Sequence, residues 1–498
     1  MHLYWFYKHT IRGICTKLYL TISFNNINST HSCSQSASRY LCSLRVLIIL
    51  CVLFLINSCA PKLTNISPPV EEPQSFSYTG TEVIPEKWWT TFKDTTLNTL
   101  IDSALSKNME LAATWQQVLA ARAIKKRQAS TLWPQVEANA RTSLNRPQAN
   151  FTGGEDIQLG FSASYEFDLW GRLRSAKQAE AFRAQASFYD YQTTALVLST
   201  QIATIWYQLV TAQRQLTLVN QQIETNNDIV KLIQTRFSSG QTRAVDILRQ
   251  RQLLESTRNI KIGYETDVAL LQNQLAVLLG EAPQNNPIPI ANDSLPALPP
   301  LPETGLPLEL IRKRPDVQQA QHLLLAADRD MAEAVRSQYP RLSVSATGQF
   351  RSNAYDDLFK EWAYSLAANI VAPLFYGGQI RAEIDRTEAL KNQQLYTYGQ
   401  TVLTSFREVE DALLQEQKQK EQLESLKRQL KLTEKVNRQL KIEFLYGASE
   451  YLDVLLSLNQ EQQLRRDVIS AEQTQLEIRI DLYRALAGSF EIENPATP

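Results

Sequence analysis

Two long stretches of the chain contain no proline and almost no glycine, and they constrain the fold more than any other feature. They run from about Arg172 to Ser238 and from about Gln379 to Tyr446. Because nothing in them breaks a helix, each is predicted to form one helix. A helix of roughly 67 residues extends on the order of 100 Å, far beyond the diameter of a compact domain. The two stretches therefore predict rods rather than a globule.

The chain also contains an internal duplication. Gly240 and Gly447 each end one long stretch, stand 207 positions apart, and precede an apolar-Asp-apolar-apolar motif by five residues. Glycine tolerates positive φ, so both are predicted to reverse the chain into return helices. The matched segments are 133–136 with 339–342, 169–172 with 374–378, and 245–248 with 452–455. This self-similarity predicts a first repeat at 86–282, a proline-rich linker at 283–307, a second repeat at 308–488 and a tail at 489–498.

Each repeat begins with apolar residues at helical spacing and continues with strict alternation. The helical segments span 95–132 and 308–338, and shorter alternating runs at 136–140 and 342–346 follow them. With the longer alternating runs, each repeat is predicted to supply a hairpin, which makes four strands. The longer runs are Ile157, Leu159, Phe161, Ala163, Tyr165 and Phe167, and Trp362, Tyr364, Leu366, Ala368, Ile370 and Ala372. Four strands cannot close a barrel in lipid, so other copies of the chain are expected to complete it.

The N-terminal region has the pattern of an export signal. Arg39 and Arg45 precede an apolar run, 46–56, that is too short to span a bilayer as a helix. The run ends Ile56-Asn57-Ser58-Cys59, which resembles the lipobox of bacterial lipoproteins. Residues 1–58 are therefore predicted to be a signal peptide, extended at its start by an early-assigned translation start. Cys59 is predicted to carry the lipid and 59–85 to be the tether, the alternative being an ordinary cysteine.

Composition argues against several classes of function. Lysine plus arginine equals aspartate plus glutamate at 51 each, which removes the electrostatic case for a nucleic-acid partner. All five cysteines lie in the first 59 residues, and His322 is the only histidine beyond them. Thiol or imidazole clusters for metals, cofactors or nucleophilic catalysis are thus missing from the remainder. No convergent spacing of carboxylates suggests hydrolysis, so the chain is predicted not to be an enzyme, with no cofactor and no metal.

A set of motifs, in order along the chain, resembles the outer membrane factor family of the TolC superfamily. Within it the lipoprotein branch, NodT-like or OprM-like, is the most similar. The motifs are Trp88-Trp89 with Phe92 and Asp94, the 166–172 turn, Pro373 to Gly378, and the paired glycine-to-aspartate segments. The resemblance implies a mainly helical fold in which very long antiparallel helices form a periplasmic α-barrel. Four strands per chain would contribute to a trimeric transmembrane β-barrel.

The same resemblance implies a function and partners. The chain would be the outer membrane exit duct of a tripartite efflux pump, passively conducting drugs or other small toxic compounds. It would be a lipid-anchored homotrimer in outer membrane lipid, extending into the periplasm. Its partners would be a periplasmic adaptor protein, docked at the helical tips, and an RND-type pump of the inner membrane. Two alternatives remain open: the exit duct of a type I protein secretion system, and a periplasmic helical scaffold or adaptor lipoprotein.

The resemblance also suggests where the periplasmic gate lies. In similar proteins the aspartate of the second tip lines the closed mouth, which makes Asp453 the main gate candidate and Asp246 a weaker one. Leu456 stands where some relatives carry a second aspartate, so it would form an apolar constriction. Three copies of one carboxylate around a narrow axis would favour cations. The alternative is that Asp453 only stabilises the start of its return helix.

Two further groups of residues are candidates for contacts outside the chain. The predicted tips would expose the adaptor-contact residues, although turn formation alone also explains the glycines. The aromatic residues at the strand ends are candidates for the membrane interface, and simple core packing is the alternative. The first group is Gly240, Arg243, Gly447 and Ser449, and the second is Trp133, Trp170, Tyr339 and Phe375.

Overall fold

The computed structural model describes residues 70, 74–144, 155–283, 288–290, 294–305, 307–352 and 355–488. The chain divides into two compact units, Met1–Thr64 and Asn65–Pro498, and all described residues belong to the second. The predicted signal peptide, the lipidation candidate Cys59 and the predicted tail 489–498 lie outside the described residues.

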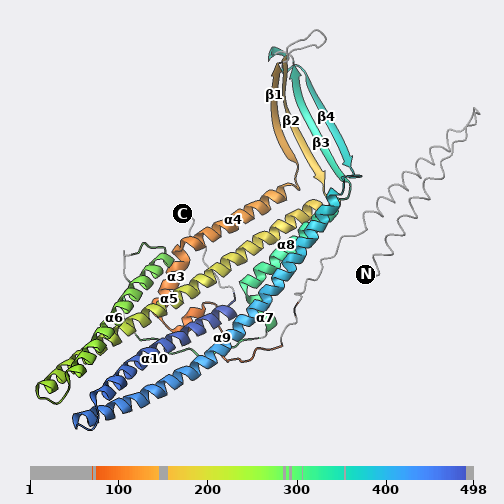
Figure 1. The fold of residues 1–498 in the computed structure, drawn as a ribbon. Coiled ribbons are helices and arrows are strands. Elements are labelled where there is room, and N and C mark those ends of the chain that lie inside the picture. The colour runs from red at the N-terminus through yellow and green to blue at the C-terminus, as the bar shows by residue number, and fades with distance from the viewer. Residues whose placement is uncertain are drawn as a thin grey trace, which may run out of the picture. The chain divides into compact units, whose positions relative to one another are not determined.

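Apart from one short 3-10 helix in each, which falls at a different place, both repeats contain the same elements in the same order: two helices, two strands and two helices (Figure 1). The first comprises the short helix η1 (Trp88–Phe92), then α3 (Thr95–Lys107), α4 (Met109–Ser130), β1 (Gln135–Leu144), β2 (Glu155–Phe167), α5 (Arg172–Ser238) and α6 (Ala244–Leu278). The second comprises α7 (Pro307–Lys313), α8 (Pro315–Arg336), β3 (Arg341–Ser352), the short helix η2 (Tyr355–Asp357), β4 (Trp362–Val371), α9 (Gln379–Leu445) and α10 (Tyr451–Leu486). The predicted mainly helical fold with four strands is confirmed.

The two long helices match their predicted bounds closely. α5 and α9 each contain 67 residues, and each begins directly after a left-handed glycine, Gly171 or Gly378. Gly240 and Gly447, with φ of 71° and 77°, lie beyond their ends, where the chain turns into α6 and α10. Absence of proline and near-absence of glycine within a segment, with Gly399 of α9 as the exception, and glycine at its end were thus sufficient to define these helices.

The segments predicted to be helical upstream of the strands are helical, and each is divided into two helices. Asn108 ends α3 and begins α4: its Oδ1 accepts the Leu111 N–H at 2.9 Å, and its Nδ2 donates to the Leu278 carbonyl at 2.9 Å. In the second repeat the break falls at Arg314, where Pro315 begins α8. Proline cannot donate the backbone hydrogen bond that would continue α7. The apolar periodicity runs across both breaks and therefore gave no sign of them.

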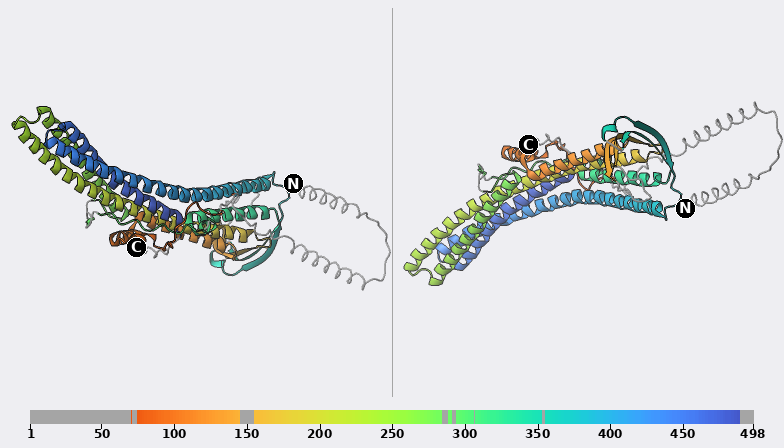
Figure 2. Two further views of the ribbon diagram at one scale, coloured as in Figure 1. Left: turned by 90° about the horizontal axis from the view of Figure 1, so that it is seen from below. Right: turned by 90° about the horizontal axis from the view of Figure 1, so that it is seen from above.

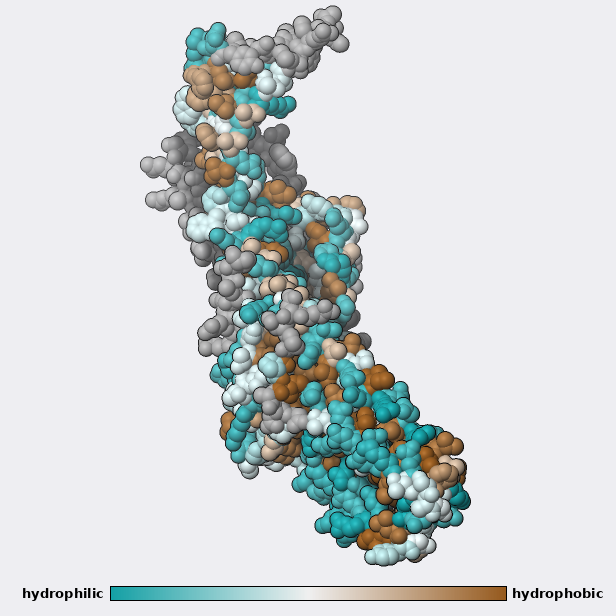
Figure 3. All heavy atoms as spheres, turned by 90° about the vertical axis from the view of Figure 1, so that its left-hand side faces the viewer, coloured by the Kyte–Doolittle hydropathy of each residue, from teal (hydrophilic) through white to brown (hydrophobic). Residues whose placement is uncertain are grey.

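The four strands form one antiparallel sheet in the order β1-β2-β3-β4. β1 and β4 are its two edges. Gly160 in β2 crosses Gln349 of β3 so closely that a Cβ would lie 2.6 Å from the Gly348 carbonyl oxygen. Much of the predicted apolar face is solvent-exposed in the single chain, with Phe161 67% and Leu366 75% exposed. Figure 3 shows apolar side chains on the surface of one side of the molecule.

The hydrophobic core joins the beginning of the chain to its end. α5 packs against α3, α4, α6, α8 and α10, and α9 packs against α8 and α10. Figure 2 shows the α5–α6 and α9–α10 pairs side by side in both views. Trp88 stacks on Tyr483 of α10 with ring centroids 5.9 Å apart, and Trp206 of α5 donates to Asp94 at 2.8 Å. The largest hydrophobic cluster therefore contains residues of both repeats.

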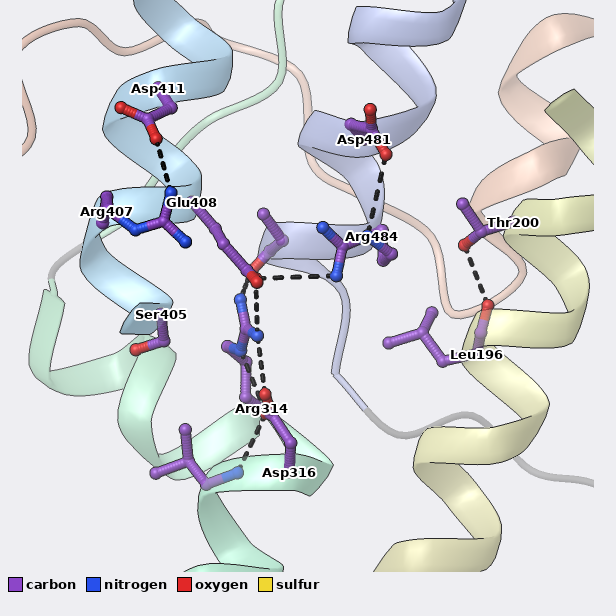
Figure 4. A network of polar contacts seen from close by, with 12 residues as sticks. Leu196, Thr200, Arg314, Asp316, Ser405, Arg407, Glu408, Asp411, Asp481 and Arg484 are labelled. Atoms are coloured by element: carbon purple, nitrogen blue, oxygen red, sulfur yellow. Dashed lines mark hydrogen bonds and ion pairs between the residues drawn. The ribbon is translucent and has the colours of Figure 1, made fainter. Parts of the chain in front are cut away.

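Two buried arginines bind the linker and the start of α8 to the long helices. Arg479 of α10 is 1% exposed and binds the Glu416 carboxylate of α9 together with the carbonyls of Pro299 and Pro300 in the linker. Arg314 binds Asp316 at 2.7 Å and Glu408 of α9 at 2.8 Å (Figure 4). Removing a single partner from such a buried ion pair typically costs about 3–5 kcal/mol. These contacts hold the linker and the start of α8 on the helices of the second repeat.

Candidate functional site at the helix tips

The α5–α6 tip and the α9–α10 tip have the same backbone turn. Gly240 N–H donates to Phe237 and Gln241 N–H donates to Arg236; Gly447 and Ala448 repeat both bonds. No atom lies within 4 Å of a Cβ built on either glycine, so space does not require them. Their positive φ requires glycine, because a residue with a β-carbon in this conformation costs about 1–2 kcal/mol. Turn formation therefore accounts for both glycines, and their predicted adaptor contact stays a prediction.

The two tips touch each other through a small core and a few polar contacts. The core consists of the buried residues Ile233, Phe444, Tyr451 and Val454. The Tyr451 hydroxyl donates to Gln250 of α6 at 2.5 Å, and burial, with Asp246 nearby, raises the pKa of Tyr451 above its usual value. On the surface, Arg243 lies 3.3 Å from Glu450. Each tip therefore supports the other.

Asp246 is used within its own tip. It occupies the third position of α6 and is 3% exposed. Its carboxylate accepts the backbone N–H of Arg243 at 3.1 Å and lies 3.5 Å and 3.8 Å from the guanidinium groups of Arg243 and Arg249. The acidic group thus closes the first turn of the helix, which is the role of the acid in a capping box.

Asp453 occupies the same third position of α10, but its side chain is exposed. Among the described residues its carboxylate has no hydrogen-bond or ion-pair partner, and Glu450, the residue before α10, makes no side-chain cap. Leu456, one turn further along, is 59% exposed. A free carboxylate and an exposed leucine are accessible to a pore or to another protein. The geometry therefore favours Asp453 and Leu456 over Asp246 as gate residues, and the gate itself stays a prediction.

A group of buried polar side chains, which we call the polar seam, joins α5, α6 and α10 near the tips, and it was not predicted from the sequence. Asn226 and Gln462 exchange amide hydrogen bonds at 3.0 Å and 3.3 Å, and Asn226 also donates to Thr257. The Arg466 guanidinium, 6% exposed, donates to Gln222 at 2.5 Å. Asparagine and glutamine at positions where a long helix otherwise buries apolar side chains are the sequence signal that could have predicted this polar seam.

The aromatic residues at the strand ends fall into two classes. Trp170 stacks on Tyr339 with ring centroids 5.0 Å apart and donates to the Pro340 carbonyl at 2.8 Å. Trp133 and Phe375 are 73% and 89% exposed. The first two rings pack on each other but stay partly exposed, Tyr339 at 39%, whereas the last two present large apolar surfaces to the surroundings. Their place at a membrane interface stays a prediction.

No group of three or more histidine, cysteine, aspartate or glutamate side chains within the described ranges is arranged to hold a metal ion. In the part of the chain that the structure describes, one helix, α5, has a window apolar enough to cross a bilayer, but 72% of that window is buried inside the protein. The window therefore belongs to the helical core.

A family model described as outer membrane efflux protein matches residues 100–281 and 306–488, once in each repeat. The chain belongs to the outer membrane efflux protein family. It is 28% identical over 425 residues to the pyoverdine export outer membrane protein OpmQ of Pseudomonas aeruginosa, covering 81% of this chain and 88% of that one. It is 29% identical over 421 residues to the toluene efflux pump outer membrane protein TtgF of Pseudomonas putida, covering 81% and 85%.

Solved structures agree with the sequence relatives. The outer-membrane channel OprN superposes with a TM-score of 0.79 at 25% identity, covering 86% of this chain and 98% of that one. The fold of the Neisseria gonorrhoeae MtrE outer membrane channel matches with a TM-score of 0.76 at 23% identity, covering 87% and 98%. This outer membrane efflux protein is therefore a channel of the outer membrane that extends into the periplasm, and the predicted family is confirmed.

Proposed function

We propose that this outer membrane efflux protein is the exit duct of a tripartite pump, formed by three copies of the chain. It would work with an RND-type pump of the inner membrane and a periplasmic adaptor. The observation that carries the proposal is a four-stranded sheet with two free edges and an exposed apolar face, continuous with helices of 67 residues.

The free edges support assembly from several copies. Inside lipid, each unpaired backbone N–H or C=O costs several kcal/mol. β1 and β4 have unpaired edges in the described chain, and closure requires β4 of one copy to pair with β1 of the next. A periplasmic scaffold would need long helices but no such sheet, so the sheet favours a duct over that alternative.

The relatives support small organic molecules as the cargo. TtgF is named as part of a toluene efflux pump and OpmQ as a pyoverdine export protein. The duct is accordingly proposed to conduct small toxic compounds passively, without catalysis, metal or cofactor. The competing role in type I protein secretion remains the alternative, because the geometry of a tube does not select its cargo.

The tips support the gate and the adaptor site. Around a threefold axis, Asp453 would form a ring of exposed carboxylates with Leu456 one turn away, which would restrict the mouth and favour cations. The exposed turn residues, from Gly240 to Arg243 and from Gly447 to Ser449, would contact the adaptor. Export and acylation of Cys59 would attach the chain to the membrane ahead of the tether 59–85.

Planar-bilayer conductance of the purified protein tests the gate. Asp453→Ala is expected to raise conductance and weaken cation selectivity, because it removes the exposed carboxylates. Asp267→Ala is the matched control, since Asp267 is exposed on α6 and its side chain makes no ion pair or hydrogen bond among the described residues. Unchanged conductance and selectivity in Asp453→Ala would remove Asp453 from the gate.

A deletion strain tests the cargo and cysteine cross-linking tests the adaptor. Deletion should sensitise cells to organic solvents and drugs; loss of a secreted protein with unchanged sensitivity would instead indicate type I secretion.

All five native cysteines lie in the first 59 residues, so a cysteine introduced at a tip is the only one in the repeats. Gln241→Cys and Ala448→Cys should cross-link to the adaptor, and Asp267→Cys should not.

A further inference from the structure

The membrane-proximal end of α4 carries four basic residues, which we call the α4 basic patch. They are Arg122, Lys125, Lys126 and Arg127, and all four side chains are exposed. No aspartate or glutamate occurs between Glu110 and Glu137. Positive charge in this part of the chain is therefore uncompensated by any residue nearby in the sequence.

The fold does not compensate it either. Among the described residues the patch makes no ion pair, and its only side-chain contact of a polar kind is the Arg122 guanidinium over the Trp115 ring, 5.2 Å from the centroid. Trp115 is buried against Tyr191 of α5, so this contact fixes the Arg122 stem beside the helix pair and leaves its charge unpaired.

The patch lies immediately before a membrane strand. α4 ends at Ser130 and β1 begins at Gln135, with the exposed Trp133 between them. Lys126 lies about 6 Å from the end of the helix at 1.5 Å per residue. The headgroup layer on each side of the hydrocarbon is roughly 5–8 Å thick. Lys125, Lys126 and Arg127 are thus within reach of headgroups, and Arg122 is within about one Debye length, 8–10 Å, of them.

The second repeat shows that this charge is not required by the fold. α8 occupies the equivalent place before β3, yet it carries four acidic and two basic residues where α4 carries one acidic and four basic. Its acidic side chains pair with basic residues of neighbouring helices: Arg183 and Arg172 of α5 bind Asp330 and Glu333, and Lys391 of α9 binds Asp328. A helix that leads into the sheet can therefore have its charges paired, whereas the four basic side chains of α4 have no acidic partner among the described residues.

We propose that the α4 basic patch binds the headgroups of anionic phospholipids in the periplasmic leaflet of the outer membrane. Cations beside a negatively charged bilayer are attracted to its surface, with an effect of about fivefold per charge. The patch supplies four of them on one helix end next to the exposed Trp133 ring, which suits the boundary between hydrocarbon and headgroup.

Spin-labelled lipids test the proposal with the full chain in phosphatidylcholine vesicles. The protein-associated fraction is measured for labelled phosphatidylglycerol and for labelled phosphatidylcholine. The parent protein is expected to prefer phosphatidylglycerol by at least about fivefold at low salt, and to lose the preference in about 1 M salt. R122Q/K125Q/K126Q/R127Q should show a ratio near one. K125Q/K126Q should lie between, and this half variant keeps the test decisive if the full one inserts poorly.

The control removes the same number of charges elsewhere. Four basic side chains of α9 are exposed and make no ion pair or hydrogen bond among the described residues: Lys420, Lys431, Lys435 and Arg438. Their fourfold glutamine variant should keep the lipid preference. Equal association of both lipids with the parent would overturn the proposal. So would an undiminished preference in the patch variant, an equal loss in the control, or a patch-dependent affinity for peptidoglycan without lipid preference. Loss of the oligomer in the patch variant with lipid preference intact would show that a second copy covers the patch.

Discussion

The α5–α6 and α9–α10 tips share one backbone turn and place an aspartate at the same third helical position, but they bury the two side chains differently. Asp246 is 3% exposed and closes the first turn of α6 by accepting the Arg243 N–H. Asp453 is exposed and has no side-chain partner among the described residues. Duplication has therefore preserved the turn while leaving one carboxylate structural and the other free. The free one is available for function.

The preceding residue explains part of the difference. Arg243 before α6 is attracted to Asp246, with a guanidinium-to-carboxylate distance of 3.5 Å. Glu450 before α10 carries the same charge as Asp453 and instead pairs with Arg243 of the other tip at 3.3 Å. Like charges on one turn repel, so the Asp453 carboxylate lacks the attraction that holds Asp246 beside the first turn of its helix.

The largest effect on stability is expected from Asp246→Ala. The variant loses the cap of α6 and leaves the Arg243 N–H without its acceptor, at a cost of about 1–2 kcal/mol. Hydrogen exchange of the amides around residues 241–247 should accelerate accordingly, whereas Asp453→Ala should leave the corresponding amides of α10 within about twofold. Equal acceleration in both variants would remove the distinction between the tips.

The two glycines should behave alike, because the tips have the same turn. Gly240→Ala and Gly447→Ala each place a β-carbon at positive φ and should each destabilise their turn by about 1–2 kcal/mol. Limited proteolysis at the tips measures this. A large difference between the two variants would mean that something other than the backbone conformation holds one of the turns.

Tyr451→Phe should cost about 1 kcal/mol, since it removes the bond from the buried hydroxyl to Gln250 and leaves that amide oxygen unsatisfied. Opening of one tip away from the other, followed by the distance between spin labels at Gln241 and Ala448, should become more frequent. Phe237→Tyr is a control for aromatic substitution at an exposed ring of the first tip. Unchanged label distances in Tyr451→Phe would show that the apolar core alone joins the tips.

The smallest effect is expected from Arg243→Gln. The ion pair with Glu450 joins two exposed side chains and contributes less than about 1 kcal/mol, decreasing with salt. The variant also removes the guanidinium that lies 3.5 Å from Asp246, but the Arg249 guanidinium at 3.8 Å still faces that carboxylate. The backbone N–H that caps α6 remains in this variant, so thermal stability should stay close to that of the parent. Any large change in drug resistance would then reflect the adaptor contact proposed for Arg243. A marked loss of thermal stability would show instead that the ion pairs of Arg243 contribute strongly to the stability of the tip.

Most of the fold could be predicted from local sequence, and most of the tip chemistry could not. The absence of helix breakers defined α5 and α9, and alternation defined the strands, because both patterns report local geometry. The breaks at Asn108 and Arg314 interrupt no apolar period and depend on a tertiary bond to Leu278 and on Pro315. Asp246 and Asp453 match in sequence, and their different burial depends on the residue before each helix and on the packing of one tip on the other. The residues at 243 and 450 were the one local sign of that difference.

The most direct test of the central claim is the mass and secondary structure of the full chain extracted in detergent. Because the sheet has two free edges and an exposed apolar face, we expect a particle of three copies, stable to mild heating in detergent, whose β-structure disappears only when the copies separate. A single folded copy that is soluble without detergent and keeps its sheet would contradict it.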